Sequence, residues 1–290
     1  MKIQRNAGWF FKEIERGIPE RNPRETEFFR INAPGEAVVR EFIQNSLDAR
    51  KNQEPIKVKI SFHSTRRENV SIFLEDTLIS HLNACGLLEG REYPEEVPYI
   101  LLEDFNTTGL EGPYKPDARE GDFYNFWWRE GISQKTGQRA GRWGLGKTTF
   151  HIVSKIRTFW GLTVRGDGKI LLMGKALLKT HSLNEKRYHY FGCFSLEDSM
   201  PVEDNSILSR FRNSFAISRN DTETGLSVII PLPVDEINFD SIRKGVILHY
   251  YYPCTVHIDH DRVVSVSPFL FFYLFWRKGC VDKLGLFYQV

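Results

Sequence analysis

One segment, residues 35–52, limits the fold of this chain more than any other. Its sequence, "GEAVVREFIQNSLDARKN", has apolar side chains at Val38, Val39, Phe42, Ile43 and Leu47. Apolar residues that recur every three to four positions lie on one face of an α-helix. The segment therefore predicts a helix that buries this face against the rest of the chain.

Shorter segments predict the strands on which that helix packs. Alternating or β-branched residues favour strands at 56–63, 69–75, 99–104, 188–194 and 225–233. The turn "GDG" at 166–168 joins "RTFWGLTVR" to "KILLMGKALL" in a predicted hairpin. A final helix is expected over 238–250. The sequence therefore predicts helices combined with a sheet.

The composition is typical of a globular protein. The 290 residues are 41% hydrophobic and 26% charged, which suits one large domain or one domain with an appendage. A net charge of +2 gives no sign of an overall nucleic-acid-binding surface. Four scattered cysteines without a CxxC pair favour free thiols in a reducing compartment. The polar N-terminus is unlike a secretory signal, and no run reaches the ~20 apolar residues of a membrane span. We expect a cytoplasmic protein without a membrane segment.

The predicted helix also has a polar stripe, formed by Glu41, Asn45 and Asp48 at positions i, i+4 and i+7. These side chains border the apolar face. A carboxamide oxygen can ligate Mg²⁺ without adding charge, and a carboxylate can accept a proton from an attacking water. The stripe is compatible with metal–nucleotide chemistry or with an ordinary polar helix face.

A second segment, "GRWGLGKTTF" at 141–150, has the residue spacing of a P-loop. A P-loop follows a buried strand and leads into a helix whose N-terminal amides bind phosphate. The preceding residues 129–143 are polar and basic, with no apolar run. The strand that should precede a P-loop is therefore missing. A P-loop NTPase or kinase that uses Gly141–Thr148 is kept as a weaker alternative.

Four segments, in order, resemble the motifs of the GHKL ATPases, whose hydrolase branch includes gyrase B, MutL, MORC proteins and the heat-shock chaperone ATPase. "EFIQNSLDA" (41–49) is similar to the E-x-x-x-N-x-x-D-A motif of that family, and "LLEDFNTTGL" (101–110) to its strand that ends in aspartate before a glycine turn. "GRWGLGK" (141–147) resembles the G-x-x-G-x-G lid, and "TETGLSVIIP" (222–231) resembles the last motif, where Thr-Gly opens a strand. The resemblance implies the Bergerat ATP-binding fold, an α+β two-layer sandwich with a mixed, mostly antiparallel sheet covered by helices.

The resemblance also implies ATP and Mg²⁺ as ligands and a role for each matching residue. Glu41 would be the general base that activates water, Asn45 would ligate Mg²⁺, and Asp104 would accept a hydrogen bond from the adenine amino group. Glycines in the lid would let backbone amides approach the phosphates. The other nucleotide-binding positions would be Asp48, Gly109, Gly144, Leu145, Gly146, Lys147, Thr148 and Thr224.

Two motifs depart from the pattern of the family. "DFNTTG" delays the first glycine to Gly109, so the turn after Asp104 is expected to differ. Gly225-Leu226 stands where many members have Gly-Thr, so the role given to Thr224 could shift by one residue. Glu103 is expected to face the other side of its strand.

The function implied is Mg-dependent ATP binding and slow hydrolysis that closes a lid and drives dimerisation or engagement of a partner subunit. The ATP-binding domain would cover 1–245, with the lid at about 105–147. Residues 246–290 would be a C-terminal extension or the start of a truncated second domain. The functions of other members of the family suggest DNA handling or antiviral defence in bacteria. The alternative from another class is a scaffold that senses nucleotide without turnover.

Two aromatic segments lie outside these motifs. "FYNFWW" (123–128) is interpreted as packing at the base of the lid, as a dimer contact, or as a nucleic-acid stacking surface beside basic residues. "SPFLFFYLFW" (267–276) is too short to span a bilayer, so a core strand or a subunit contact is expected.

Overall fold

The computed structural model describes residues 6–22, 33–52, 55–88, 92–115, 117–129, 148–250, 255–259 and 263–267. The helices are α1 (Pro34–Asp48), α2 (Arg67–Val70), α3 (Asp76–Ala84), α4 (Gly121–Trp127), α5 (Thr148–Ile152), α6 (Asn205–Ser214) and α7 (Phe239–Tyr250). The strands are β1 (Gly8–Glu13), β2 (Lys57–Arg66), β3 (Glu96–Phe105), β4 (Thr158–Val164), β5 (Ile170–Leu177), β6 (His181–Leu183), β7 (Lys186–Ser195), β8 (Gly225–Pro231), β9 (Thr255–Asp259) and β10 (Val263–Ser267).

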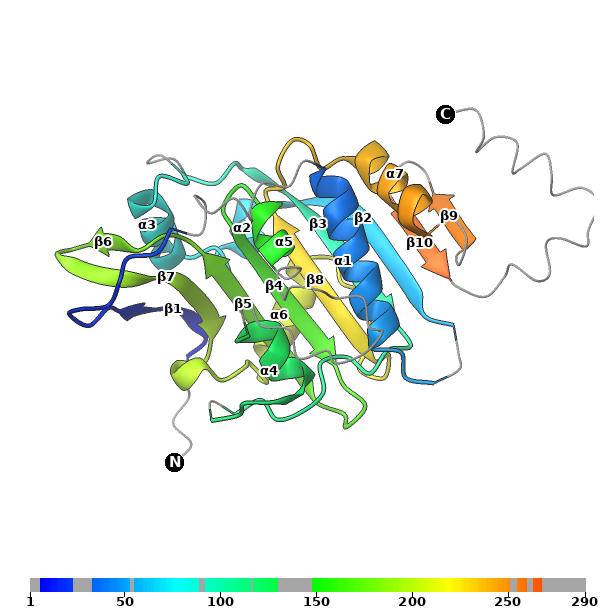
Figure 1. Ribbon diagram of the computed structural model, residues 1–290, viewed down its shortest axis with the longest axis horizontal. Helices are drawn as coiled ribbons and strands as arrows, with labels where there is room; N and C mark the ends of the chain where they lie inside the picture. The colour runs from blue at the N-terminus through cyan, green and yellow to red at the C-terminus, as the bar shows by residue number, and fades with distance from the viewer. Residues whose placement is uncertain are drawn as a thin grey trace, which may run out of the picture.

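All ten strands of the described chain belong to one sheet, in the order β1-β7-β5-β4-β8-β3-β2-β10-β9, with β6 paired to β7 (Figure 1). Each pairing between them is antiparallel. The predicted α+β class with a mostly antiparallel sheet is therefore confirmed. The strands β3 and β8 lie side by side in the sheet although their sequences are far apart.

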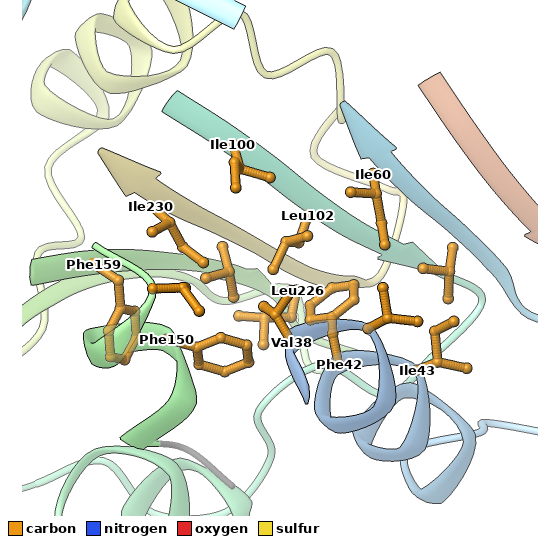
Figure 2. Packing of buried hydrophobic residues seen from close by; sticks show 14 of the residues in the cluster. Val38, Phe42, Ile43, Ile60, Ile100, Leu102, Phe150, Phe159, Leu226 and Ile230 are labelled. Carbon is orange, nitrogen blue, oxygen red and sulfur yellow. The ribbon is translucent and has the colours of Figure 1, made fainter. Parts of the chain in front are cut away.

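Helices cover both faces of this sheet. Side chains of α1, α4, α5 and α7 form one hydrophobic cluster with the strands, and Figure 2 shows Phe42 and Phe150 of this cluster against the sheet residues Leu102, Leu226 and Ile230. Side chains of α2, α3 and α6 form a second cluster on the opposite face. The sheet is thus the central layer, with the longest helix, α1, on one side of it.

The predicted helix at 35–52 is α1, and its apolar face is buried as expected. Val38, Val39, Phe42 and Ile43 are each at most 1% exposed. Pro34 stands in the first turn, where its missing N–H and fixed φ are tolerated. Gly35 allows α7 to approach closely, because a Cβ there would lie 2.5 Å from the Ser241 hydroxyl. Residues 49–52 lie beyond the end of the helix.

One strand prediction is wrong. Residues 69–75 form the end of α2 and the turn after it. Their buried side chains, Val70, Phe73 and Leu74, are spaced i, i+3 and i+4, which is helical spacing and not the period of two that a strand needs. The residue types of Val70, Ile72 and Phe73 favour a strand, and the prediction followed them. In the folded chain, the burial of one face against the core decides the local structure instead.

The remaining strand predictions are confirmed by β2, β3, β7 and β8, the hairpin by β4 and β5, and the last helix by α7. The helix α7 continues through residue 245, and β10 pairs with β2, so elements on both sides of that residue contribute to one sheet and its cover. None of the helices in the described ranges is long and apolar enough to cross a membrane.

The aromatic segment 123–128 lies in and just after α4, and it packs into the core. Phe123, Phe126 and Trp127 are at most 8% exposed, and Trp127 stacks on Phe159 of β4 at a centroid distance of 5.4 Å. Lys175 of β5 donates a hydrogen bond to the Trp127 carbonyl over 2.9 Å. Packing onto the domain therefore explains these three side chains. The other aromatic segment, 267–276, lies outside the described residues apart from Ser267.

Candidate functional site

The carboxylate of Asp104 is the centre of the polar site. Asp104 stands near the end of β3, on the face that carries α1, and is 4% exposed. Its Oδ1 atom accepts hydrogen bonds from the Leu226 amide at 2.8 Å and from the Thr107 hydroxyl at 2.7 Å. Its Oδ2 atom lies 3.0 Å from the Ser46 hydroxyl. Three segments of the chain, α1, the β3 end and the β8 start, thus meet at one side chain.

Helix α1 brings the predicted stripe beside this carboxylate. Asn45 donates from Nδ2 to Glu41 Oε1 at 2.8 Å, so the amide oxygen of Asn45 points away from Glu41. Asp48, the last residue of α1, accepts a hydrogen bond from Gln44 at 3.1 Å. Glu41, Asn45 and Asp48 are all partly exposed, whereas Ser46, on the apolar face between them, is fully buried. The stripe is therefore in part accessible to solvent, and Ser46, the neighbour of Asn45 in the chain, contacts Asp104.

The turn after β3 is shaped by Gly109. Its φ of +70° is in the left-handed region, and a Cβ there would lie 2.6 Å from Thr163 Oγ1 and 2.7 Å from the Val164 carbonyl. The hydroxyl of Thr163 accepts from the Leu110 amide at 2.9 Å and donates to the Gly225 carbonyl at 3.2 Å. Gly109 thus sits beside the β8 start.

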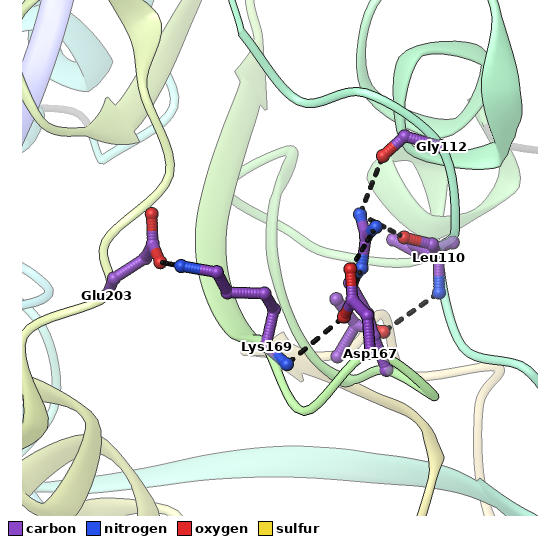
Figure 3. Close-up of polar contacts among 7 residues, drawn as sticks. Leu110, Gly112, Asp167, Lys169 and Glu203 are labelled. Atoms are coloured by element: carbon purple, nitrogen blue, oxygen red, sulfur yellow. Dashed lines mark hydrogen bonds and ion pairs between the residues drawn. The ribbon is translucent and has the colours of Figure 1, made fainter.

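An arginine fixes the next part of this loop to the β4–β5 hairpin. Arg165 donates to the carbonyls of Leu110, at 3.1 Å, and Gly112, at 2.7 Å. Two further bonds, from Nε and Nη2, hold both oxygens of Asp167. Figure 3 shows Leu110, Gly112 and Asp167 around this contact, with Lys169 extending from the turn to Glu203. Hydrogen bonds from Arg165 therefore join residues 110–112 to the β4–β5 turn.

At the start of β8, the contact with Asp104 is made by the backbone. The amide that binds Asp104 belongs to Leu226, one position after Gly225. Thr224 is partly exposed and precedes the strand, and no described hydrogen bond joins its side chain to Asp104. Leu226 lies two positions after Thr224, so the role of Thr224 toward a nucleotide, with its possible shift of one residue, stays a prediction.

On the opposite face of β3, Glu103 is also buried. Its Oε1 atom accepts from Ser227 of β8 at 3.1 Å, and its Oε2 atom lies 3.8 Å from Lys59 Nζ. Arg219, from the loop after α6, reaches the same region and is 2% exposed. The prediction that Glu103 faces away from Asp104 is confirmed, and the residue belongs to a polar network of its own.

The two neighbouring carboxyl groups have shifted acidities. Burial raises the pKa of Asp104, while the charge of Arg219, the Leu226 amide and the hydroxyls of Thr107 and Ser46 act in the opposite direction. Burial also raises the pKa of Glu103, against the charges of Arg219 and Lys59. Burial is the largest effect, so the pKa of Asp104 is raised overall, although the donors around it favour the ionised form. In either form a carboxyl oxygen can accept a hydrogen bond from an amino group.

Part of the predicted site lies outside the described residues, namely Gly144, Leu145, Gly146 and Lys147. Thr148 is described and opens α5, which packs on α1 through Phe150 and Phe42 at a centroid distance of 6.4 Å. Within the described ranges, no group of three or more His, Cys, Asp or Glu side chains is placed to hold a metal ion. Asn45, the predicted metal ligand, contacts Glu41 through its amide nitrogen, and its role toward Mg²⁺ stays a prediction.

Sequence reasoning missed Ser46, Thr107, Thr163 and Arg219. Ser46 had a signal, because it is a polar residue on the apolar face of the predicted helix. Thr107 and Thr163 had none beyond their place near a predicted strand end. Arg219 occurs in "AISRNDTETG", where no pattern sets it apart.

Comparison of the chain with models of known protein families and with curated proteins found no match. Membership of the GHKL superfamily therefore stays a prediction that rests on the residues of this chain.

Proposed function

We propose that this protein binds Mg-ATP and hydrolyses it slowly, with the nucleotide between α1 and the ends of β3 and β8. The observation that carries the proposal is the buried Asp104 carboxylate, joined through Ser46 to the helix that bears Glu41 and Asn45. A buried acid held by several donors in a polar site is typical of ligand recognition, although structural networks also use such groups.

The donor set around Asp104 fits an adenine ring. Each carboxylate oxygen can accept two hydrogen bonds, and Oδ2 has one donor, Ser46, among the described contacts. The exocyclic amino group of adenine would supply a second. Guanine and hypoxanthine have a carbonyl oxygen at the same position, which an ionised carboxylate repels. Asp104 would therefore select adenine over other purines.

The Glu41–Asn45 pair supplies the groups for hydrolysis. The amide oxygen of Asn45 and the phosphate oxygens would together hold Mg²⁺, which usually takes few protein ligands when phosphates are present. When bound, the metal would neutralise charge on the phosphates. Asn45 donates to one oxygen of Glu41 and so orients its carboxylate. Glu41 would accept the proton of the water whose oxygen bonds to the γ-phosphorus while the bond to the ADP oxygen breaks.

Dimerisation or binding of a partner subunit when ATP is bound is part of the same proposal, as is work on DNA or in antiviral defence. These parts of the proposal follow from the resemblance of the four motifs. The mass of the protein in solution, measured with and without a non-hydrolysable ATP analogue, tests the dimer directly.

The first experiment compares steady-state hydrolysis of Mg-ATP by the wild type, Glu41→Ala and the control Glu36→Ala, with ATP binding measured for each. Glu36 is also on α1 but pairs with Lys244 of α7, away from the stripe. We expect Glu41→Ala to lose at least about 100-fold in kcat while its Kd stays near that of the wild type, which is the usual scale for a general base. Glu36→Ala should keep both values.

Other outcomes would point elsewhere. Wild-type binding without turnover would favour the nucleotide-sensing scaffold. Hydrolysis that survives Glu41→Ala but is abolished by Lys147→Ala would favour a P-loop enzyme.

A further inference from the structure

We infer that Arg219 is a positioning residue that sets the geometry of the adenine pocket from the opposite face of the sheet. The inference rests on the proposed function and names a determinant of its base selectivity. Arg219 lies in the loop between α6 and β8, and its side chain contacts Ser227 and Phe105, on the face of the sheet that carries Glu103.

The guanidinium of Arg219 binds where the sheet pairing stops. The β3–β8 ladder ends at the pair Glu103↔Ser227. The next residues on the two strands are Asp104 and Leu226, where the proposed function places the adenine ring. Arg219 Nη2 donates to the Asp104 carbonyl and, at 3.1 Å, to the Leu226 carbonyl. One planar group therefore takes over the role of the ladder at the position where the pocket begins.

Further contacts fix the orientation of that group. Nε donates to the Ser227 hydroxyl at 3.0 Å, and Ser227 in turn donates to Glu103 at 3.1 Å. Nη1 donates to the Glu223 carbonyl at 2.9 Å. The guanidinium carbon lies 4.3 Å from the ring centroid of Phe105, the residue that follows Asp104. The plane of Arg219 is thus held by bonds at its edge and by a ring on its face.

The same residues present their other polar groups to the pocket. Asp104 offers its carbonyl to Arg219 and its carboxylate to the α1 side, and Leu226 offers its carbonyl to Arg219 and its amide to Asp104 Oδ1 at 2.8 Å. Between them, Gly225 has a φ of +146°, and a Cβ there would lie 2.6 Å from both Asp104 Oδ1 and Arg219 Nη1. Displacing the guanidinium would therefore change the direction of the carboxylate.

A lysine cannot replace this contact. Its ammonium is a point charge with three donors on a flexible stem, whereas the arginine fork reaches several acceptors in one plane. Arg219→Lys keeps the charge near Glu103 and Asp104 but loses the simultaneous bonds to both carbonyls. It therefore separates positioning from simple charge balance.

The test measures equilibrium binding of ATP and of inosine triphosphate, which lacks the amino group, to the wild type, Arg219→Lys and Ser227→Ala. The wild type should prefer ATP. In Arg219→Lys we expect the Kd for ATP to rise about 10-fold, the scale of one or two lost charge-assisted bonds, with little change for inosine triphosphate. Ser227→Ala should show a smaller change in the same direction.

Phe211→Leu is the matched control, because Phe211 is buried in the layer that contains α6 and packs on Phe215 and Phe73. It should lower the melting temperature and leave the preference for ATP at the wild-type value. A variant that is only less stable would bind ATP and inosine triphosphate more weakly by the same factor.

The possible results are distinct. If Arg219→Lys and Ser227→Ala retain the wild-type preference, Arg219 does not position the pocket, while the ATPase proposal stands. If Arg219→Lys does not fold, the preference of Ser227→Ala for ATP over inosine triphosphate tests the inference alone. A preference equal to that of the wild type would then overturn it. If the wild type binds neither nucleotide, or binds both equally, the proposed use of Asp104 fails and the inference fails with it.

Discussion

Ser46 and Asp104 connect the longest helix to the centre of the sheet through one hydrogen bond. The Ser46 hydroxyl is 2.9 Å from the Phe42 carbonyl and 3.0 Å from Asp104 Oδ2. A hydroxyl has a single hydrogen, and a carboxylate is the stronger acceptor, so Asp104 takes the bond. Both side chains are buried, which makes the contact independent of solvent.

Replacing Ser46 with alanine should leave Asp104 short of one donor in a buried position. We expect Ser46→Ala to lower the free energy of unfolding by about 1–3 kcal/mol, the cost of an unsatisfied charged group, and to weaken ATP binding. Urea denaturation and equilibrium binding measure the two effects. Ser71→Ala is the control, because the exposed Ser71 hydroxyl bonds only to the Glu68 carbonyl, and it should be close to neutral.

Two glycines with similar φ angles differ in how closely other atoms pack against them. Comparing the stability that each loses on substitution by alanine measures the effect of close packing at the site. Gly109 and Gly168 have φ of +70° and +80°, but only at Gly109 would a Cβ meet other atoms within 4 Å. Gly168→Ala should cost about 1 kcal/mol from backbone strain alone. Gly109→Ala should cost about 2–3 kcal/mol, because the Cβ also displaces Thr163. Equal losses of stability in the two variants would show that the turn relaxes freely.

A buried histidine pair near the N-terminal strand should make stability depend on pH. His181 Nδ1 donates to the Lys179 carbonyl at 2.7 Å, so its Nε2 accepts from His81 Nδ1, also at 2.7 Å, and both rings are neutral. Burial, with the neighbouring His181, lowers the pKa of His81 to about 4. Burial also lowers the pKa of His181, opposed by its bond to Lys179.

The direction of the effect follows from the lowered pKa values. Between about pH 6.5 and pH 4 the unfolded chain binds more protons than the folded one, so stability falls as the pH is lowered through this window. Denaturation at several pH values should show a shallower fall for His81→Gln than for the wild type. Identical slopes would mean that other groups cause the acid sensitivity. The stacking of Phe11 on His81, at 3.7 Å between ring centroids, makes β1 the element that should loosen first.

The sequence predicted regular elements well where one pattern extended over many residues. Helix α1 and strand β3 have long apolar patterns, and both were found within a few residues of their predicted bounds. Residues 69–75 were misjudged because their β-forming residue types were given more weight than the helical spacing of their three buried side chains. Helices α3 and α6 are short, and their apolar faces are defined by the sheet against which they pack.

The residues of the candidate site could likewise be predicted only in part from the sequence. Glu41, Asn45 and Asp104 could be selected because they stand at fixed spacing on predicted elements. Arg219 could not, because its partners include a carbonyl 115 residues earlier in the chain. Contacts to backbone atoms have no residue-type signature, so a side chain whose partners are carbonyls leaves no motif in a single sequence.

The place of β8 between β3 and β4 also governs the order of events during synthesis. Strand β3 can pair with β2 as soon as it leaves the ribosome, but its other edge waits for β8, which begins 120 residues after β3 ends. At about 5–20 residues per second, that interval is about 6–24 s. During it, the edge that carries Glu103 and Asp104 is an open template for unintended strand pairing. This edge of β3 is therefore covered only when β8, which ends at Pro231, has emerged.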